Sequence, residues 1–315
     1  MTNSSAQLRV LVSGGGGFVG SHVVPALLAR ACDVAVLIRP GSDTSRIDDA
    51  LPRVQRVESD VMNLHSARAA IRAFAPQAVA HLAWRGVSHR YRDDQAQNDN
   101  VHATQSLLHL AHEAGCTAFI GVGSQAEYGL HGHAMDESTP TRPCTAYGNA
   151  KLAACALAQS LCPSLGMRFA WLRLFSTYGP MDSPDCLLPY VIANLLRGHA
   201  VEFTAGAQQW DYLYVQDAAE AMVRVIETPS AQGIFNLGSG RTHTIRAIVE
   251  QVRDMIDPSA PLQFGARPYA PQQVMHLQAD IARLQAATGW SPKVSLTQGL
   301  ARTIAWHRGQ EVRRG

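Results

Sequence analysis

The chain has 315 residues and a mass of 34.0 kDa, and its 46% hydrophobic and 17% charged residues are typical of a folded globular protein rather than a disordered one. Its 27 lysine and arginine residues against 25 aspartate and glutamate residues give a formal charge of +2, which indicates neither nucleic acid nor an anionic membrane as a partner. No apolar run approaches the roughly 20 residues of a membrane-spanning helix, and the six cysteines form neither a C-x-x-C pair nor a zinc-type cluster with histidine. We therefore expect a cytoplasmic protein with reduced thiols, no metal site and no membrane or nucleic-acid partner.

Short apolar segments alternate with segments of helical periodicity through the first half of the chain. The apolar segments predict strands at residues 8–13, 34–38, 54–57, 78–83, 118–123 and 169–175. The periodic segments predict helices at residues 19–31, 66–74, 101–114 and 147–161. This alternation predicts a parallel sheet, and the nearly continuous apolar strands indicate that helices cover both of its faces.

The alternation stops after residue 175. Residues 176–209 are rich in proline and glycine around one predicted helix at 187–196. The following segments predict a strand at 212–215, a helix at 218–227 capped by Asp217, a strand at 235–237, a helix at 245–256 and irregular structure at 258–277. We expect an α/β protein with a doubly wound, Rossmann-type sheet. A nucleotide-binding domain would span residues 1–175, with elements near 211–256 returning to it, and residues 176–315 would form a smaller substrate-binding lobe.

A glycine-rich turn follows the first predicted strand. Gly14, Gly17 and Gly20 give the pattern G-x-x-G-x-x-G between this strand and the first helix. Glycine permits the tight turn and lets the backbone approach a pyrophosphate, while the helix N-terminus presents free N–H groups to the anion. A glycine triplet alone could be an ordinary turn, but the strand–turn–helix context predicts a dinucleotide site.

The end of the second predicted strand bears on the choice of cofactor. An acidic residue there would bind the ribose 2′-hydroxyl of NAD, whereas this chain continues from Ile38 into Arg39. A guanidinium suits a 2′-phosphate, so we expect NADP(H), with NAD(H) as the alternative if Arg39 is simply a solvated loop residue. Asp60, after the third predicted strand, is placed to accept a hydrogen bond from the adenine amino group.

Ser124, Tyr147 and Lys151 form the predicted catalytic set. Tyr147 and Lys151 are four residues apart, which places the phenol and the ammonium on one face of a helix. We expect the ammonium to lower the pKa of Tyr147 and so to favour proton transfer near neutral pH. Ser124 ends a predicted strand, where open α/β sheets place their sites, and could hold a carbonyl or hydroxyl against the phenol.

These motifs resemble those of the extended short-chain dehydrogenase/reductases, the family of nucleotide-sugar epimerases, dehydratases and reductases. The resembling segments are SGGGGFVG (13–20), HLAW (81–84), DNVHAT (99–104), GSQAEYG (123–129), YGNAK (147–151), RLFSTYGP (173–180), WDYLYVQDAAEA (210–221), FNLGSG (235–240) and TGWSP (288–292). The resemblance spans nearly the whole chain. It implies a nucleotide-diphosphate sugar as substrate and a homodimer formed through the helices at 101–114 and 147–161.

The resemblance also implies further site residues. Besides the residues already named, it assigns to the cofactor site Phe18, Val19, Val61, Leu82, Ala83, Asn100 and Phe175, together with Tyr147 and Lys151. To the substrate site it assigns Trp84, Ser124, Gln125, Ser176, Leu187, Trp210 and Arg267. The basic loop of Arg85, His89, Arg90 and Arg92 could contact a diphosphate, or could simply be solvated.

Departures from the family pattern favour one branch. The 4,6-dehydratases carry an Asp-Glu pair where this chain has Gln125 and Ala126. The UDP-galactose 4-epimerases carry an aspartate after the second strand, an asparagine at the position of Ser176 and an arginine at that of Trp210. Without that arginine, Arg197 or Arg267 could contact the diphosphate. Trp84 replaces a small residue and Glu127 an apolar one.

The segments GSQAEYG and WDYLYV are similar to those of nucleotide-activated 4-keto-6-deoxyhexose reductases. We therefore expect NADPH-dependent reduction of the C4 ketone of such a sugar, in which Tyr147 gives the proton, Lys151 holds the nicotinamide ribose and Ser124 orients the carbonyl. One alternative is an epimerase that retains its cofactor. The other is a non-catalytic dinucleotide-binding regulator, which would have no need of the intact Ser/Tyr/Lys set.

Overall fold

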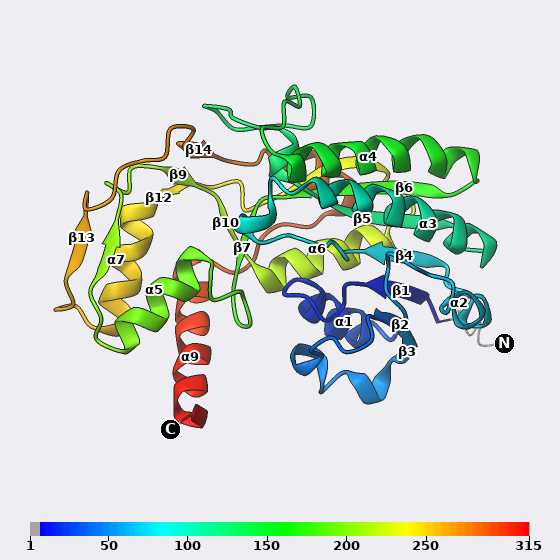
Figure 1. The fold of residues 1–315 in the computed structure, drawn as a ribbon, viewed down its shortest axis with the longest axis horizontal. Helices are drawn as coiled ribbons and strands as arrows, with labels where there is room; N and C mark the ends of the chain where they lie inside the picture. Colours follow the sequence, from blue (N-terminus) through cyan, green and yellow to red (C-terminus); the bar gives the residue numbers. More distant parts are fainter. Residues whose placement is uncertain (1–6, 315) are drawn as a thin grey trace.

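The structure is a computed structural model that describes residues 7–314, and at His89 and residues 312–314 it describes the backbone alone. Residues 1–6 and 315 of the two expected domains therefore lie outside the described part. The centre of the fold is a seven-stranded parallel sheet in the order β11-β6-β5-β4-β1-β2-β3 (Figure 1). Its strands are β1 (Arg9–Ser13), β2 (Asp33–Ile38), β3 (Gln55–Glu58), β4 (Ala78–His81), β5 (Ala118–Ser124), β6 (Arg168–Leu174) and β11 (Gly233–Leu237).

Helices cover both faces of this sheet. On one face α1 (Gly20–Ala29) packs against α6 (Val215–Glu227), and on the other α3 (Asp99–Glu113) packs against α2 (Arg68–Phe74) and α4 (Ala146–Ser164) (Figure 1). Each face has its own core of fully buried aliphatic and aromatic side chains. The predicted doubly wound α/β fold is thus confirmed. Among the described residues, no helix has both the length and the apolar character needed to cross a bilayer.

The chain reverses its direction of travel across the sheet next to β1. It moves from β1 through β2 to β3, and then crosses to β4, which pairs with the other edge of β1. Ligands of open parallel sheets bind outside the carboxyl ends of the strands at such a reversal. The glycine-rich turn follows β1 directly, so the topology places it at this point.

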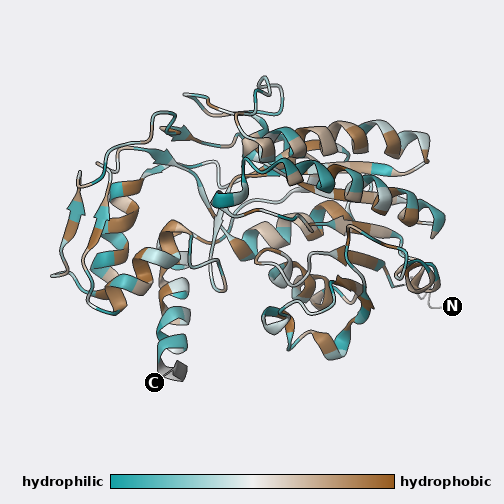
Figure 2. Ribbon diagram, in the orientation of Figure 1, coloured by the Kyte–Doolittle hydropathy of each residue, from teal (hydrophilic) through white to brown (hydrophobic). Residues whose placement is uncertain are grey.

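A smaller lobe lies to one side of the sheet (Figure 1). Its core lies among the buried faces of three helices and several short strands. Along α7, the buried residues Ile245, Ile248, Val249 and Val252 recur at helical spacing, and Figure 2 shows the resulting mixture of hydrophobic and hydrophilic residues. The elements after β6, other than α6 and β11, are β7 (Ser176–Tyr178), α5 (Leu187–Leu196), β8 (Val201–Phe203), β9 (Gln209–Trp210), β10 (Tyr212–Tyr214), β12 (His243–Thr244), α7 (Ile245–Ile256), β13 (Leu262–Phe264), β14 (His276–Leu277), α8 (Ala282–Thr288) and α9 (Leu296–Arg314).

A buried carboxylate connects the lobe to the late segments of the chain. Asp211 is completely buried, and its oxygens accept hydrogen bonds from the backbone N–H groups of Ser239 (2.7 Å), Gly240 (3.0 Å) and Ala279 (3.1 Å). The Ser239 hydroxyl donates a fourth bond of 2.6 Å. Because four donors compensate the buried charge, this carboxylate fixes the strand turn at β9–β10 against two distant segments.

Two predictions from the sequence are wrong in this half of the chain. Residues 258–277, expected to be irregular, contain β13, which pairs with β8, and β14, which pairs with β9. Strands of two or three residues are too short for apolar alternation to appear. Asp217 does not cap a helix, because β10 runs directly into α6 at Val215. The Asp217 carboxylate instead accepts N–H bonds from Lys293 (3.1 Å) and Val294 (2.8 Å).

A substitution at Gly121 tests how closely β5 and β6 are packed. Trp171 of β6 is fully buried, and a Cβ atom placed on Gly121 would overlap its indole ring. We expect Gly121→Ala to lower the free energy of unfolding by about 1–3 kcal/mol, because the ring cannot move within a filled core. Urea denaturation measures the change. Gly132→Ala is the control, since a Cβ there meets no atom within 4 Å, and equal effects of the two substitutions would contradict the packing argument.

Candidate active site

A groove of about 370 Å³ opens at the carboxyl ends of β1, β2 and β4. Gly14 has a φ of +77°, and a Cβ on it would lie 2.5 Å from the backbone nitrogen of Ala83. The backbone of the turn can therefore come close to the end of β4 and to a ligand in the groove. Of the predicted cofactor residues, Gly14, Gly17, Arg39, Asp60, Val61 and Ala83 line the groove, while Phe18, Val19, Gly20 and Leu82 belong to the turn and strand end that frame it.

Arg39 and Asp60 line the groove from the loops that follow β2 and β3. Arg39 is exposed beside Ser42, and within the described chain its guanidinium has no ion-pair partner. Asp60 accepts a hydrogen bond from the backbone nitrogen of Met62 (3.0 Å) and pairs with Arg85 (3.3 Å). The guanidinium of Arg39 is thus free to meet an anion, whereas the carboxylate of Asp60 already has partners within the protein. The adenine contact of Asp60 stays a prediction.

The three predicted catalytic residues converge at the end of β5. Ser124 is the last residue of this strand, and its hydroxyl accepts a hydrogen bond from the backbone nitrogen of Ala126 (3.2 Å). Tyr147 lies in the first turn of α4, which Thr145 caps, and Lys151 follows one turn later. The Lys151 ammonium donates to the backbone oxygen of Val122 at 2.6 Å. All three catalytic side chains are buried.

The surroundings of Tyr147 differ from the expectation. Burial raises the pKa of Tyr147, while a hydrogen bond with Ser124 and the positive charge of Arg92 act in the opposite direction. The Arg92 guanidinium lies 5.4 Å from the centre of the Tyr147 ring, and the Lys151 ammonium lies 5.9 Å away. The prediction that Lys151 lowers the pKa of Tyr147 is therefore wrong for this structure, because burial dominates and Arg92 is the opposing cation.

Lys151 is enclosed on all sides. Burial lowers the pKa of Lys151 to about 7, and the negative charge of Glu127 acts to raise it. Trp84, predicted from the resemblance to contact substrate, lines the groove, and the centre of its indole ring lies 3.7 Å from the ammonium. The ring also packs edge-on against Tyr147, and its contact with substrate stays a prediction. Its ring nitrogen donates to Gln97 at 2.7 Å. Trp84 therefore helps to hold both catalytic side chains in place.

Glu127 is a buried group that the sequence analysis noted as a departure but did not place in the site. Its carboxylate accepts hydrogen bonds from the Ser124 backbone nitrogen (2.9 Å), the Trp171 ring nitrogen (3.0 Å) and the Arg173 guanidinium (2.8 Å). Both members of the Glu127–Arg173 ion pair are almost completely buried. The available signal was an arginine inside the apolar segment FAWLRLF, which requires a buried partner.

The arginines of the basic loop after β4 each make a different contact. Arg85 pairs with Asp60, Arg90 lies over the Tyr91 ring, and Arg92 lies against Tyr147. The Nε atom of Arg92 is buried and has no hydrogen-bond partner within the described chain. The side chain of His89 lies outside the described residues. Asn100, expected at the cofactor, is buried and bonds to both backbone groups of Arg85 (2.7 and 3.1 Å), so it shapes the loop instead of lining the groove.

The remaining predicted substrate residues lie near Ser124, at the start of α5, around Trp210 or on the surface. Gln125 adjoins Ser124, the Trp210 ring nitrogen donates to the Ser176 hydroxyl (2.7 Å), and Leu187 begins α5. Phe175, expected at the cofactor, is buried against Tyr128. The two arginines considered for the diphosphate are exposed and already paired: Arg267 with Glu202 (3.2 Å) and Arg197 with Glu311 (2.7 Å).

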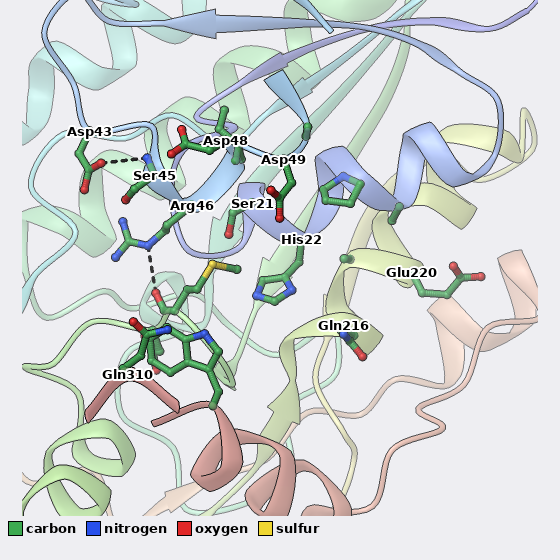
Figure 3. A pocket seen from close by; sticks show the side chains of 18 residues that line it. Ser21, His22, Asp43, Ser45, Arg46, Asp48, Asp49, Gln216, Glu220 and Gln310 are labelled. Carbon is green, nitrogen blue, oxygen red and sulfur yellow. Dashed lines mark hydrogen bonds between the residues drawn. The ribbon is translucent and has the colours of Figure 1, made fainter. Parts of the chain in front are cut away.

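A larger cleft of about 970 Å³ lies between α1, α6 and α9 (Figure 3). Arg46 reaches across it and donates from Nε to the backbone oxygen of Met181 at 3.0 Å. Asp43 and Ile47 line both this cleft and the groove. Ser124, Tyr147 and Lys151 line neither space, but Trp84 lines the groove and packs against both Tyr147 and Lys151. The groove and the end of β5 are therefore the candidate active site.

Known proteins share this arrangement. Residues 10–238 match the model of the NAD dependent epimerase/dehydratase family. The chain is 29% identical to a dTDP-glucose 4,6-dehydratase of Streptomyces griseus, over 95% of this chain and 94% of that protein. It is 28% identical to UDP-glucuronic acid decarboxylase 1 of Arabidopsis thaliana, over 96% of this chain and 71% of that protein.

A solved structure shares the fold over the same extent. The UDP-glucose 4-epimerase of Thermus thermophilus, in complex with NAD, is 28% identical, with a TM-score of 0.85 over 96% of this chain and 99% of that one. The family model covers most of the chain, including the glycine turn and all three predicted catalytic residues. The chain therefore belongs to the NAD dependent epimerase/dehydratase family.

Proposed function

We propose that this enzyme uses NADPH to reduce the C4 ketone of a nucleotide-diphosphate 4-keto-6-deoxyhexose. The observation that carries the proposal is the state of the carboxylate beside the catalytic serine. The positions that hold an Asp-Glu pair in the 4,6-dehydratases are Gln125 and Ala126, and neither has a carboxylate. The next residue, Glu127, is 0% exposed, and both of its oxygens are bonded within the protein. This segment thus offers no acid or base for elimination, while Tyr147 can still supply the proton that reduction requires.

The cofactor preference follows from the rim of the groove. β2 ends at Ile38 without the acidic residue that would bind a ribose 2′-hydroxyl, and the unpaired Arg39 guanidinium comes next. A guanidinium donates to a phosphate through several N–H groups in one plane. These features support NADP(H) over NAD(H), and NADPH is the form suited to a net reduction.

The residues present fit a dinucleotide, because the missing side chain of Gly14 lets the turn lie against the backbone of Ala83, and Gly14 and Gly17 line the groove with their backbone exposed to a ligand. A bound nicotinamide supplies the hydride. Ser124 donates to the ketone oxygen, and Tyr147 delivers its phenolic proton to the same oxygen as the alcohol forms. Lys151 holds the ribose beside them. The site accelerates the reduction by aligning these groups and by excluding water from them.

An epimerase that retains its cofactor is the alternative, favoured by the shared fold and 28% identity with the Thermus UDP-glucose 4-epimerase. Net consumption of cofactor separates the two. We expect one NADPH to be oxidised per sugar converted when a panel of nucleotide-activated 4-keto-6-deoxyhexoses is followed by absorbance at the NADPH band and by product chromatography. Stoichiometric dinucleotide released on denaturing the dialysed protein, together with sugar interconversion without added cofactor, would establish the epimerase instead.

Tyr147→Phe tests the assignment of the proton donor. The substitution removes the hydroxyl and keeps the ring that packs against Trp84 and Arg92, so turnover should fall by at least about 100-fold. NADPH affinity, measured by fluorescence titration, should stay within about twofold of wild type. Turnover close to that of the wild type would show that another group gives the proton.

Arg39→Ala tests the cofactor preference. Loss of a charge-assisted contact of about 1.5–3 kcal/mol should weaken NADPH binding roughly 10- to 150-fold and leave NADH binding nearly unchanged. Arg56→Ala is the control, because Arg56 is also exposed but pairs with Glu58 on β3. Calorimetric titration of both cofactors measures the effect, and equal losses for NADPH and NADH would contradict a 2′-phosphate contact.

A further inference from the structure

Glu127 is a fully buried anion for which the reduction itself has no use. It lies in the short turn Gln125–Glu127 directly after β5, at the back of the catalytic site. Its three hydrogen bonds come from a backbone nitrogen, an indole and a guanidinium on two adjacent strands. Burying a carboxylate and an arginine together removes two charges from water and often contributes little net stability. The position of the pair suggests a role in the site rather than in holding the fold.

The end of β5 joins this anion to the catalytic groups. The backbone oxygen of Val122 accepts from the Lys151 ammonium, and two residues later the Ser124 nitrogen donates to Glu127. Between them, Gly123 has no side chain, and a Cβ there would overlap both the Glu127 carboxylate and the Trp171 ring. The bond to Glu127 and the bond from Ala126 to the Ser124 hydroxyl form a capping box, which fixes the orientation of the catalytic serine.

Lys151 is the group that most requires a nearby negative charge. Its ammonium is removed from water, yet its contacts are a neutral carbonyl and the face of Trp84. His81, facing it from β4, is buried and neutral between Ser13 (2.7 Å) and Thr104 (3.0 Å). Tyr147 faces it from α4 and is an uncharged phenol when it is ready to donate a proton.

The charged groups nearby belong to other elements. Arg92 lies 5.4 Å from the centre of the Tyr147 ring, and Arg173 is bonded to Glu127. No ion pair joins Glu127 to Lys151 directly, so any attraction between them acts across β5 and is weakly screened in this buried setting. Of these side chains, the Glu127 carboxylate is the anion that can favour the charged form of Lys151.

We propose that Glu127 is a positioning residue that favours the charged form of Lys151 and fixes Ser124 through its backbone. With Glu127 in place, the ammonium can donate to the ribose hydroxyls and face the phenolate that remains on Tyr147 after proton transfer. Without it, the protonation equilibrium of Lys151 shifts further towards the neutral amine. The consequence for turnover rests on the proposed function, but the charge of Lys151 can be measured with neither sugar nor dinucleotide.

The composition of the chain makes this measurement direct. The sequence contains two lysines, Lys151 and the exposed Lys293. In a Lys293→Arg background labelled with lysine that carries ¹³C at the ε position, the NMR signal of Lys151 is therefore the one lysine resonance, and its shift with pH reports its protonation. We expect Glu127→Gln to lower the pKa of Lys151 by at least about one unit, which is a tenfold or greater loss of the charged form at pH values above both midpoints.

The direction in which the pKa of Lys151 shifts distinguishes the loss of the Glu127 charge from damage to the fold. A disrupted site would admit water and raise the pKa of Lys151 towards that of a free lysine, which is opposite to the expected change. Glu127→Asp keeps the charge and should hold the pKa of Lys151 near the wild-type value. Glu137→Gln is the control, because Glu137 also accepts a backbone N–H bond (Asn236, 2.7 Å) but is not among the groups that face Lys151.

Glu127→Gln leaves Arg173 buried without a countercharge and could prevent folding. The double variant Glu127→Gln, Arg173→Gln removes that unpaired charge and should show the same downward shift. An unchanged or raised pKa of Lys151 in a folded Glu127→Gln or double variant would overturn the proposal. Loss of NADPH reduction with an unchanged Lys151 titration would likewise overturn it, whereas a downward shift in a protein that reduces no 4-keto sugar would refute the proposed function alone.

Discussion

The carboxyl end of β5 receives most of the bonds that hold the candidate site together. The ammonium of Lys151 donates to the carbonyl of Val122, the Ser124 nitrogen donates to Glu127, and the Ser124 hydroxyl accepts from the next turn. β5 pairs with β6 from Ala118 to Ser124, and its first part, from Ala118 to Gly121, also pairs with β4. The central sheet therefore holds Ser124 and Lys151 in fixed positions, and small changes in β5 would displace both side chains at once.

The protein contains several ionisable groups that have been removed from water, and each is stabilised differently. Asp211 and Glu127 receive several hydrogen bonds each, which compensate for their desolvation. His81 is kept neutral, because burial and nearby Lys151 lower its pKa to about 3. Lys151 alone among them relies on a carbonyl, an aromatic face and a more distant charge. The charge of a group stabilised in this looser way depends more strongly on its neighbours, so substitutions around Lys151 should alter its protonation before that of the other buried groups.

Sequence periodicity was sufficient to predict the Rossmann-type sheet, because buried parallel strands are continuous apolar runs and their helices are long. Spacing was sufficient to propose Ser124, Tyr147 and Lys151, since i and i+4 positions share a helix face and strand ends share one edge of the sheet. The partners of these residues could not be found in this way. Glu127 and Arg173 meet because β5 and β6 pair in one register, and Trp84 reaches Lys151 through a loop whose path no local pattern predicts. The pKa of Tyr147 was misjudged for the same reason, as burial depends on the packed whole.

The Trp171 indole fits beneath β5 because positions 121 and 123 are both glycine. The residues at five positions on two strands and a turn thus pack together in one space: 121, 123, 127, 171 and 173. Because these residues fill one space, we expect a substitution at one of these positions to be tolerated only with a compensating change at another. We expect relatives with a small residue at 171 to carry side chains at 121 or 123, and relatives with an apolar residue at 127 to provide another partner for the arginine at 173. Residues at these five positions should accordingly change as a group between branches of the family, so that they trace its history better than the catalytic residues themselves.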